Sequence, residues 1–221
     1  LSSNKKKSYE TTLGLFHCLG LDAIYERETE KSHGFITDAV IDNYLLLLKD
    51  HFVSSKGRTI DIMSTDFSKH LTDKKGKQNE LKIKANNTAI SSLGQNINNK
   101  IIYIPYNIDN IHWVLIVADL NQNKLFYYDS LKTQDDYLWE GHCNNIQNSL
   151  TEIYSIKSVW SKSELILSNP QQINGYDCGI YVLMYIELLT HDIDLNFEPS
   201  DATRFRLKVA HSLMQGRYYS V

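Results

Sequence analysis

Residues 170–179 read PQQINGYDCG, and residues 180–189 continue as IYVLMYIELL. The second stretch is apolar on nearly every face, and a helix of that kind belongs in a protein core. Cys178 therefore stands at the predicted start of a buried helix, directly after a turn that contains Gly175. Helix N-termini favour negative charge and are among the places where the pKa of a cysteine falls. The pattern predicts a cysteine nucleophile at the end of a rigid, buried helix.

The composition is that of an ordinary globular chain. Of its 221 residues, 42% are hydrophobic and 22% are charged, and the net charge is -3. This charge gives no reason to expect nucleic acid or an anionic membrane as a partner, and no apolar run is long enough to span a bilayer. The three cysteines form neither a disulfide framework nor a zinc motif. We therefore expect a reducing compartment, no metal and no cofactor.

The chain reads as a single catalytic domain over residues 1–221. Because it begins at Leu1, we expect it to be excised from a longer protein. Residues 1–10 are polar and rich in lysine, which predicts a flexible end. Residues 73–100 are polar with weak periodicity, which predicts an insertion or a variable surface lobe.

The periodicity predicts an α+β domain with a short, largely antiparallel central sheet packed with helices. β-branched and aromatic runs predict three strands that are close in sequence and form the middle of the sheet, with a turn at residues 121–123. The predicted strands cover residues 59–63, 100–105, 111–119, 124–129 and 164–167. One helix is predicted to follow Thr37, which can cap it. Further helices are predicted over residues 64–71, over 135–156, from Cys178 onward and near 201–215.

Three further residues fit a cysteine nucleophile. If the strands on either side of residues 121–123 pair, then His112 at the start of one lies beside Asp129 at the end of the other. An aspartate bonded to one imidazole nitrogen leaves the second nitrogen for Cys178. Gln172, six residues before the cysteine, can donate its side-chain amide to an oxyanion. The four residues together predict a thiol active site.

Each of these residues also has an ordinary explanation. A lone histidine on an apolar strand is usually part of the core, an aspartate after a strand usually forms a turn, and a buried free cysteine is usually inert. The joint occurrence of all four favours catalysis over these explanations. Cys18 and Cys143 have no comparable partners, and we expect Cys143 to be structural.

His112-Trp113, Tyr128-Asp129-Ser130 and the motif QINGYDCG at residues 172–179 resemble the ubiquitin-like-protein proteases, the family of the SUMO proteases. The resemblance implies a papain-like cysteine protease core. It also implies a cysteine isopeptidase that cuts after a C-terminal Gly-Gly, with Asn174 and Gly175 among the substrate-binding residues.

The sequence GFITDAVI at residues 34–41 resembles the Trp-Leu-Asn-Asp segment of that family. The resemblance implies that Phe35 and Trp113 flank a narrow tunnel, which selects glycine by leaving no room for a Cβ. Asp38 is then expected to contact the modifier. Phenylalanine in place of tryptophan and Thr37 in place of asparagine depart from the family pattern.

The resemblance implies ubiquitin or a ubiquitin-like protein, with its conjugates, as the partner. The abundance of Asn, Lys and Ile, the departure at Phe35 and the insertion at 73–100 favour a bacterial deubiquitylase. Such an effector would act in the host cytoplasm or nucleus after secretion, and the deubiquitylase domain of a cytoplasmic-incompatibility toxin would have this composition. Three alternatives stay open: a protease for SUMO or another modifier, an acetyltransferase effector of the same clan, and a non-catalytic ubiquitin-binding module.

Overall fold

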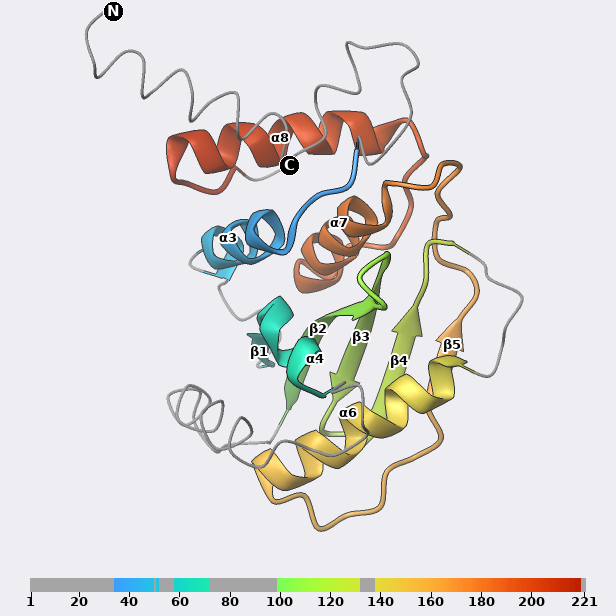
Figure 1. Ribbon diagram of the computed structural model, residues 1–221. Helices are drawn as coiled ribbons and strands as arrows, with labels where there is room; N and C mark the ends of the chain where they lie inside the picture. Colours follow the sequence, from blue (N-terminus) through green and yellow to red (C-terminus); the bar gives the residue numbers. More distant parts are fainter. Residues whose placement is uncertain (1–33, 50, 52–57, 72–98, 132–137, 220–221) are drawn as a thin grey trace, which may run out of the picture.

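The computed structural model describes residues 34–49, 51, 58–71, 99–131 and 138–219 (Figure 1). At its centre is a five-stranded sheet in the order β1-β2-β3-β4-β5. The strands are β1 (Thr59–Ile62), β2 (Lys100–Ile108), β3 (His112–Asp119), β4 (Lys124–Tyr128) and β5 (Glu164–Ile166).

The sheet is antiparallel in its middle and parallel at both edges. The β2–β3 and β3–β4 pairs are antiparallel, whereas β1 pairs with β2, and β5 with β4, in parallel. Each edge strand is joined to its neighbour by a long crossover, and a crossover permits parallel pairing where a hairpin does not. The sheet is therefore mixed, with the antiparallel character predicted from the sequence confined to its three middle strands.

Helices cover both faces of the sheet (Figure 1). They are α3 (Asp38–Lys49), α4 (Thr65–Leu71), α6 (Leu138–Tyr154), α7 (Cys178–Thr190) and α8 (Asp201–Gln215). Strand residues alternate between the faces. Leu115 and Val117 of β3 join the core under α3, α7 and α8, while Val114 and Ile116 join the core under α4 and α6. This arrangement confirms the α+β class.

The predicted elements agree with the structure, with small differences at their ends. Thr37 caps α3, because its Oγ1 accepts a hydrogen bond from the Val40 amide at 3.4 Å. Strand β2 continues past Pro105, where the sequence predicted its end. Strand β1 ends opposite Tyr103, so among the described residues no strand pairs with the β1 side of β2 at Pro105. The missing amide hydrogen of the proline therefore removes no ladder hydrogen bond on that side.

Four predictions fall wholly or partly on residues whose structure is not described, and one of them is the helix predicted over 135–156, whose residues 135–137 lie outside the described part. The flexible end at residues 1–10 lies outside the described residues, and so does Cys18. Of the predicted insertion at 73–100, residues 73–98 lie outside them, and Lys100 is the first residue of β2.

A buried carboxylate joins the three helices on one face of the sheet. Glu187 of α7 accepts a hydrogen bond from the Tyr44 hydroxyl of α3, with 2.6 Å between the oxygens, and pairs with Lys208 of α8. Burial raises the pKa of Tyr44, so the phenol stays a donor at all ordinary pH values. Helix α7 is thus fixed to both helical neighbours by a satisfied polar group within an apolar core.

We expect the Tyr44→Phe variant to lose about 1.5–3 kcal/mol of unfolding free energy, the usual contribution of a hydrogen bond to a charged group. Urea denaturation followed by circular dichroism measures this loss. Tyr219→Phe is the matched control, because the Tyr219 hydroxyl accepts an exposed hydrogen bond from Arg217; its unfolding free energy should change by less than about 0.5 kcal/mol. Equal effects of the two variants would contradict the role of the Glu187 network.

Candidate active site

Three secondary-structure ends bring His112, Asp129 and Cys178 together. His112 is the first residue of β3, Asp129 follows the last residue of β4, and Cys178 begins α7. Antiparallel pairing of β3 and β4 places the start of one beside the end of the other, and His112 Nε2 lies 2.7 Å from Asp129 Oδ1. Helix α7 packs in the same core as β3, and Cys178 hydrogen-bonds the imidazole. The juxtaposition predicted from the sequence is present.

The imidazole of His112 lies between two acceptors. Its Nε2–H donates to the Asp129 carboxylate, which leaves Nδ1 for the sulfur of Cys178. Burial by itself lowers the pKa of His112, but the hydrogen bonds and negative charges of Asp129 and Cys178 outweigh it and raise the pKa to about 9. The ring therefore keeps its proton at neutral pH. This is the condition for an imidazolium–thiolate pair, the reactive form in paired Cys–His sites.

Asp129 is held by the residue two places after it and by the segment that runs toward α7. The backbone amide of Leu131 donates to its Oδ1 at 2.8 Å. The side-chain amides of Asn169 and Gln171 both donate to the Asp129 carbonyl, at 2.8 and 2.9 Å. Asn169 Nδ2 also lies 2.7 Å from the Tyr185 hydroxyl of α7. Sequence reasoning missed these groups, because no motif or periodicity marks them.

Gln172 is buried, with 7% of its surface exposed, and its amide is oriented by two neighbours. Its Nε2 donates to the Asn174 carbonyl at 2.6 Å, and its Oε1 accepts from the Ser130 hydroxyl at 2.7 Å. Since a carbonyl only accepts, the Asn174 contact fixes the NH₂ end of the amide. Ser130 is a further site residue that the sequence analysis did not assign.

The loop before Cys178 is shaped by the Asn174 side chain. Its Oδ1 accepts from the amides of Tyr176 and Asp177 at 3.1 and 3.0 Å, and its Nδ2 donates to the Asp177 carboxylate at 2.6 Å. Gly175 is exposed, and a Cβ added there would meet no atom within 4 Å. Asn174 thus forms the turn, and contact of either residue with a substrate stays a prediction.

Gly179 permits a close contact at the start of α7. A Cβ added to it would lie 2.6 Å from Ile36 Cγ1 and 3.3 Å from Trp113 Cδ1. Trp113 is buried at 6% exposure, whereas Phe35, next to Ile36, is 40% exposed. The structure therefore brings Trp113 to the helix that carries Cys178, and of the other predicted wall it brings Ile36, the neighbour of Phe35. Asp38 is half-buried at the first position of α3.

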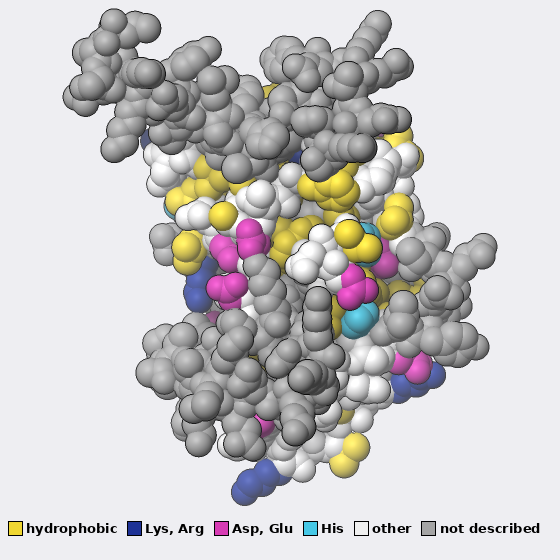
Figure 2. All heavy atoms as spheres, in the orientation of Figure 1, with side chains coloured by type: hydrophobic (Ala, Val, Ile, Leu, Met, Phe, Trp, Pro, Cys, Tyr) yellow, Lys and Arg dark blue, Asp and Glu magenta, His cyan; other side chains and the backbone are white. Residues whose placement is uncertain are grey.

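The chain segments that form the site also carry exposed apolar side chains. Figure 2 shows histidine and acidic side chains next to hydrophobic ones on this face. The exposed apolar residues on the site segments are Phe35, Ile111, Leu131, Ile173 and Tyr176. An apolar rim of this kind suits a protein substrate more than a small polar one.

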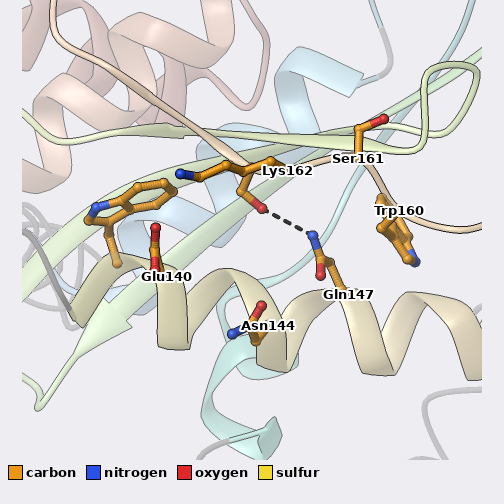
Figure 3. Close-up of a pocket in the computed structure, with 8 residues that line it drawn as sticks. Glu140, Asn144, Gln147, Trp160, Ser161 and Lys162 are labelled. Carbon is orange, nitrogen blue, oxygen red and sulfur yellow. Dashed lines mark hydrogen bonds between the residues drawn. The ribbon is translucent and has the colours of Figure 1, made fainter.

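A pocket lies on another part of the molecule, away from these residues. A pocket of about 230 Å³ lies between α6 and residues 160–163, lined by Glu140, Gln147 and Trp160 among others (Figure 3). It contains none of the four predicted catalytic residues, and α6 covers the sheet face opposite to α7. Cys143 of α6 is also on that face, and burial raises its pKa to about 12, as suits a structural cysteine.

The described residues can be compared with the requirements of a metal site and of a membrane span. Among them, no group of histidine, cysteine, aspartate and glutamate side chains is arranged to hold a metal ion. In the same part of the chain, every helix is too short or too polar to cross a bilayer.

The pKa values of two half-buried histidines should be shifted in opposite directions. His112 should lose its proton near pH 9, above the ordinary value of 6.5, while burial lowers the pKa of His142 below that value. NMR titration of the imidazole resonances measures both. Asp129→Asn removes a hydrogen bond and a charge that favour the protonated ring, so it should move the His112 midpoint to lower pH. A His112 midpoint near 6.5 in the unaltered protein would contradict the assigned hydrogen bonds.

Comparison with known proteins gives consistent relatives. The chain is 34% identical over 128 residues to the putative ubiquitin-like-specific protease 1B of Arabidopsis thaliana. The matched region covers 53% of this chain and 35% of that protein. Ubiquitin-like-specific protease 1 of Saccharomyces cerevisiae is 35% identical over 114 residues, or 51% of this chain and 18% of that protein. The chain spans between 18% and 41% of the length of these and the next curated relatives.

The fold agrees with a solved protease. The C-terminal Ulp1 protease domain, solved in complex with Smt3, the yeast ortholog of SUMO, superposes with a TM-score of 0.68 at 23% identity, covering 82% of this chain and 77% of that one. The model of the Ulp1 protease family, C-terminal catalytic domain, matches residues 34–217. This match contains every residue of the site described above, and the chain belongs to the Ulp1 protease family.

Proposed function

We propose that this chain is a cysteine isopeptidase that cleaves after the C-terminal Gly-Gly of a ubiquitin-like protein. The observation that carries the proposal is the hydrogen-bonded series Cys178–His112–Asp129 at the start of a buried helix, in a chain of the Ulp1 family. The raised pKa of His112 supports it, because the imidazolium both stabilises a thiolate and can act as an acid.

In the proposed reaction, the thiolate of Cys178 attacks the carbonyl carbon of the terminal glycine. His112 then gives its proton to the amine of the leaving lysine as the carbon–nitrogen bond breaks, and a thioester remains on the sulfur. In the second half, His112 takes a proton from water, and the resulting hydroxide attacks the thioester and releases the modifier with a free carboxylate. Asp129 keeps the imidazole in the orientation that serves both halves.

The oxyanion of each tetrahedral intermediate is stabilised by two kinds of donor in this proposal. The first is the N–H of Gln172 that is not bonded to Asn174. The second is the group of backbone amides at the start of α7, including that of Cys178. The helix dipole there adds to the attraction of these amides for the oxyanion. Ser130 supports the first donor by holding the carbonyl end of the Gln172 amide.

Phe35 and Trp113 are the proposed walls for the Gly-Gly tail. The contact of Trp113 and Ile36 with Gly179 supports this, because it brings Trp113 and the neighbour of Phe35 to the end of the helix that begins at Cys178. Asp38 and residues 73–100 are proposed to contact the body of the modifier, and Asn174 and Gly175 the tail.

The modifier has two candidates. The printed names of the relatives, which describe ubiquitin-like-specific and sentrin-specific proteases, support a SUMO-type protein. Ubiquitin is supported by the exposed Phe35 in place of the family tryptophan. It is also supported by the fold likeness to the Xanthomonas campestris effector XopD, solved bound to ubiquitin (TM-score 0.54, 17% identity, 82% of this chain and 94% of that one). Action as a bacterial effector or toxin in a host compartment remains a prediction.

A panel of modifiers with a thiol-reactive group in place of the last glycine should separate these candidates. We expect a mass increase with a ubiquitin or a SUMO probe, and none with the Cys178→Ala variant. An adduct with one probe alone identifies the modifier. If no probe reacts while the protein is folded, the isopeptidase proposal is wrong, and acetyl transfer becomes the leading alternative.

Gln172→Ala should lower kcat by about 10²–10³-fold with a small change in KM, since an oxyanion donor acts chiefly in the transition state. Steady-state cleavage of a fluorogenic modifier measures both constants. Gln147→Ala is a control for loss of a glutamine amide, because Gln147 lies in the pocket on α6. An unchanged kcat for Gln172→Ala would remove this residue from the mechanism.

A further inference from the structure

Asp177 stands at the N-cap of α7 but does not cap it. Aspartate is among the best N-cap residues because its carboxylate accepts from the second or third amide of a helix. Here the Asp177 side chain makes no cap hydrogen bond. Its Oδ2 accepts from Asn174, and its Oδ1 accepts from Nε and Nη2 of Arg206 at 2.9 and 2.7 Å.

Arg206 reaches this point from a different helix. It lies in α8, and both it and Asp177 are buried, at 3% and 6% exposure. Its Nη2 also donates to the Tyr176 carbonyl at 3.2 Å, and the guanidinium lies 5.7 Å from the centre of the Tyr176 ring. The planar fork of an arginine fixes the direction of a carboxylate in a way that a single point charge does not.

This orientation has two effects on the residue that follows. The first amides of α7 are not occupied by the Asp177 carboxylate, so they can stabilise another negative charge. The charge of the carboxylate is also balanced by the guanidinium, whereas an unpaired carboxylate next to Cys178 would oppose a thiolate or an oxyanion.

We propose that Arg206 is a positioning residue for the nucleophile, which holds the Asp177 carboxylate away from the first amides of α7 and balances its charge. Those amides are thereby kept for the negative charge that develops at Cys178. The inference rests on the proposed function, because it assumes that Cys178 is the reacting thiol.

The test measures Cys178 without any modifier. Iodoacetamide alkylation of Cys178, quantified by peptide mass spectrometry across pH, reports the fraction of thiolate. In Arg206→Met the midpoint of this profile should rise by about one pH unit, because the released Asp177 carboxylate opposes the thiolate. A rise of one unit is a tenfold loss of thiolate at a pH below the midpoint. Adding Asp177→Ala to Arg206→Met removes the released carboxylate and should return the midpoint toward the unaltered value. kcat for modifier cleavage should follow the same order.

Arg204→Met is the matched control, because Arg204 lies on the same helix with 82% of its side chain exposed. Its alkylation profile should not change. An unaltered midpoint in folded Arg206→Met, or equal midpoints in Arg206→Met and the double variant, would overturn the proposal and leave Arg206 as structural support. If Arg206→Met does not fold, Arg206→Lys serves: its midpoint should lie above that of the unaltered protein, and an equal midpoint overturns the proposal.

Failure of the proposed function gives a different result. The alkylation profiles would then keep the order given above, while the unaltered protein would react with none of the modifier probes.

Discussion

The seating of the first turn of α7 against β3 is the constraint on which the rest of the site depends. Gly179 has no side chain, so Ile36 approaches the helix backbone more closely than a Cβ would allow, and Trp113 packs tightly beside it. Because Trp113 follows His112, and Gly179 follows Cys178, the same contact sets the separation of imidazole and sulfur. An apolar packing interaction thus determines the geometry of the polar one, and the close-packed interior makes that geometry stiff.

The polar groups around this contact form one connected set. Asp129 is held through its carboxylate by Leu131 and through its carbonyl by Asn169 and Gln171, and Gln172 is tied to Ser130. Buried polar groups without partners are costly, so burial favours the Ser130–Gln172 bond most strongly, while the Leu131 bond is exposed. The loop of residues 169–172 consequently joins the end of β4 to the start of α7.

Local signals explain what the sequence predicted well. The turn at 121–123 and the β-branched runs around it specify an antiparallel pair, and that pairing alone places His112 beside Asp129. The interactions that were missed join positions far apart in the chain, such as Asp177 with Arg206, and nothing in the spacing of their residues marks them. The parallel direction of both edge strands was also missed, since it depends on crossovers whose paths local propensity does not determine.

The site is assembled from segments that are distant in sequence: residues 34–38, 112–113, 129–130 and 169–179, supported by α8. Each joining contact closes a long loop of chain, and such contacts form after local ones because loop closure costs entropy before the contact is made. The β2–β3–β4 meander can form early, while Cys178 meets His112 only when α7 has packed on β3. A partly folded chain is therefore expected to keep Cys178 apart from His112, so the proposed activity should be confined to the fully folded domain.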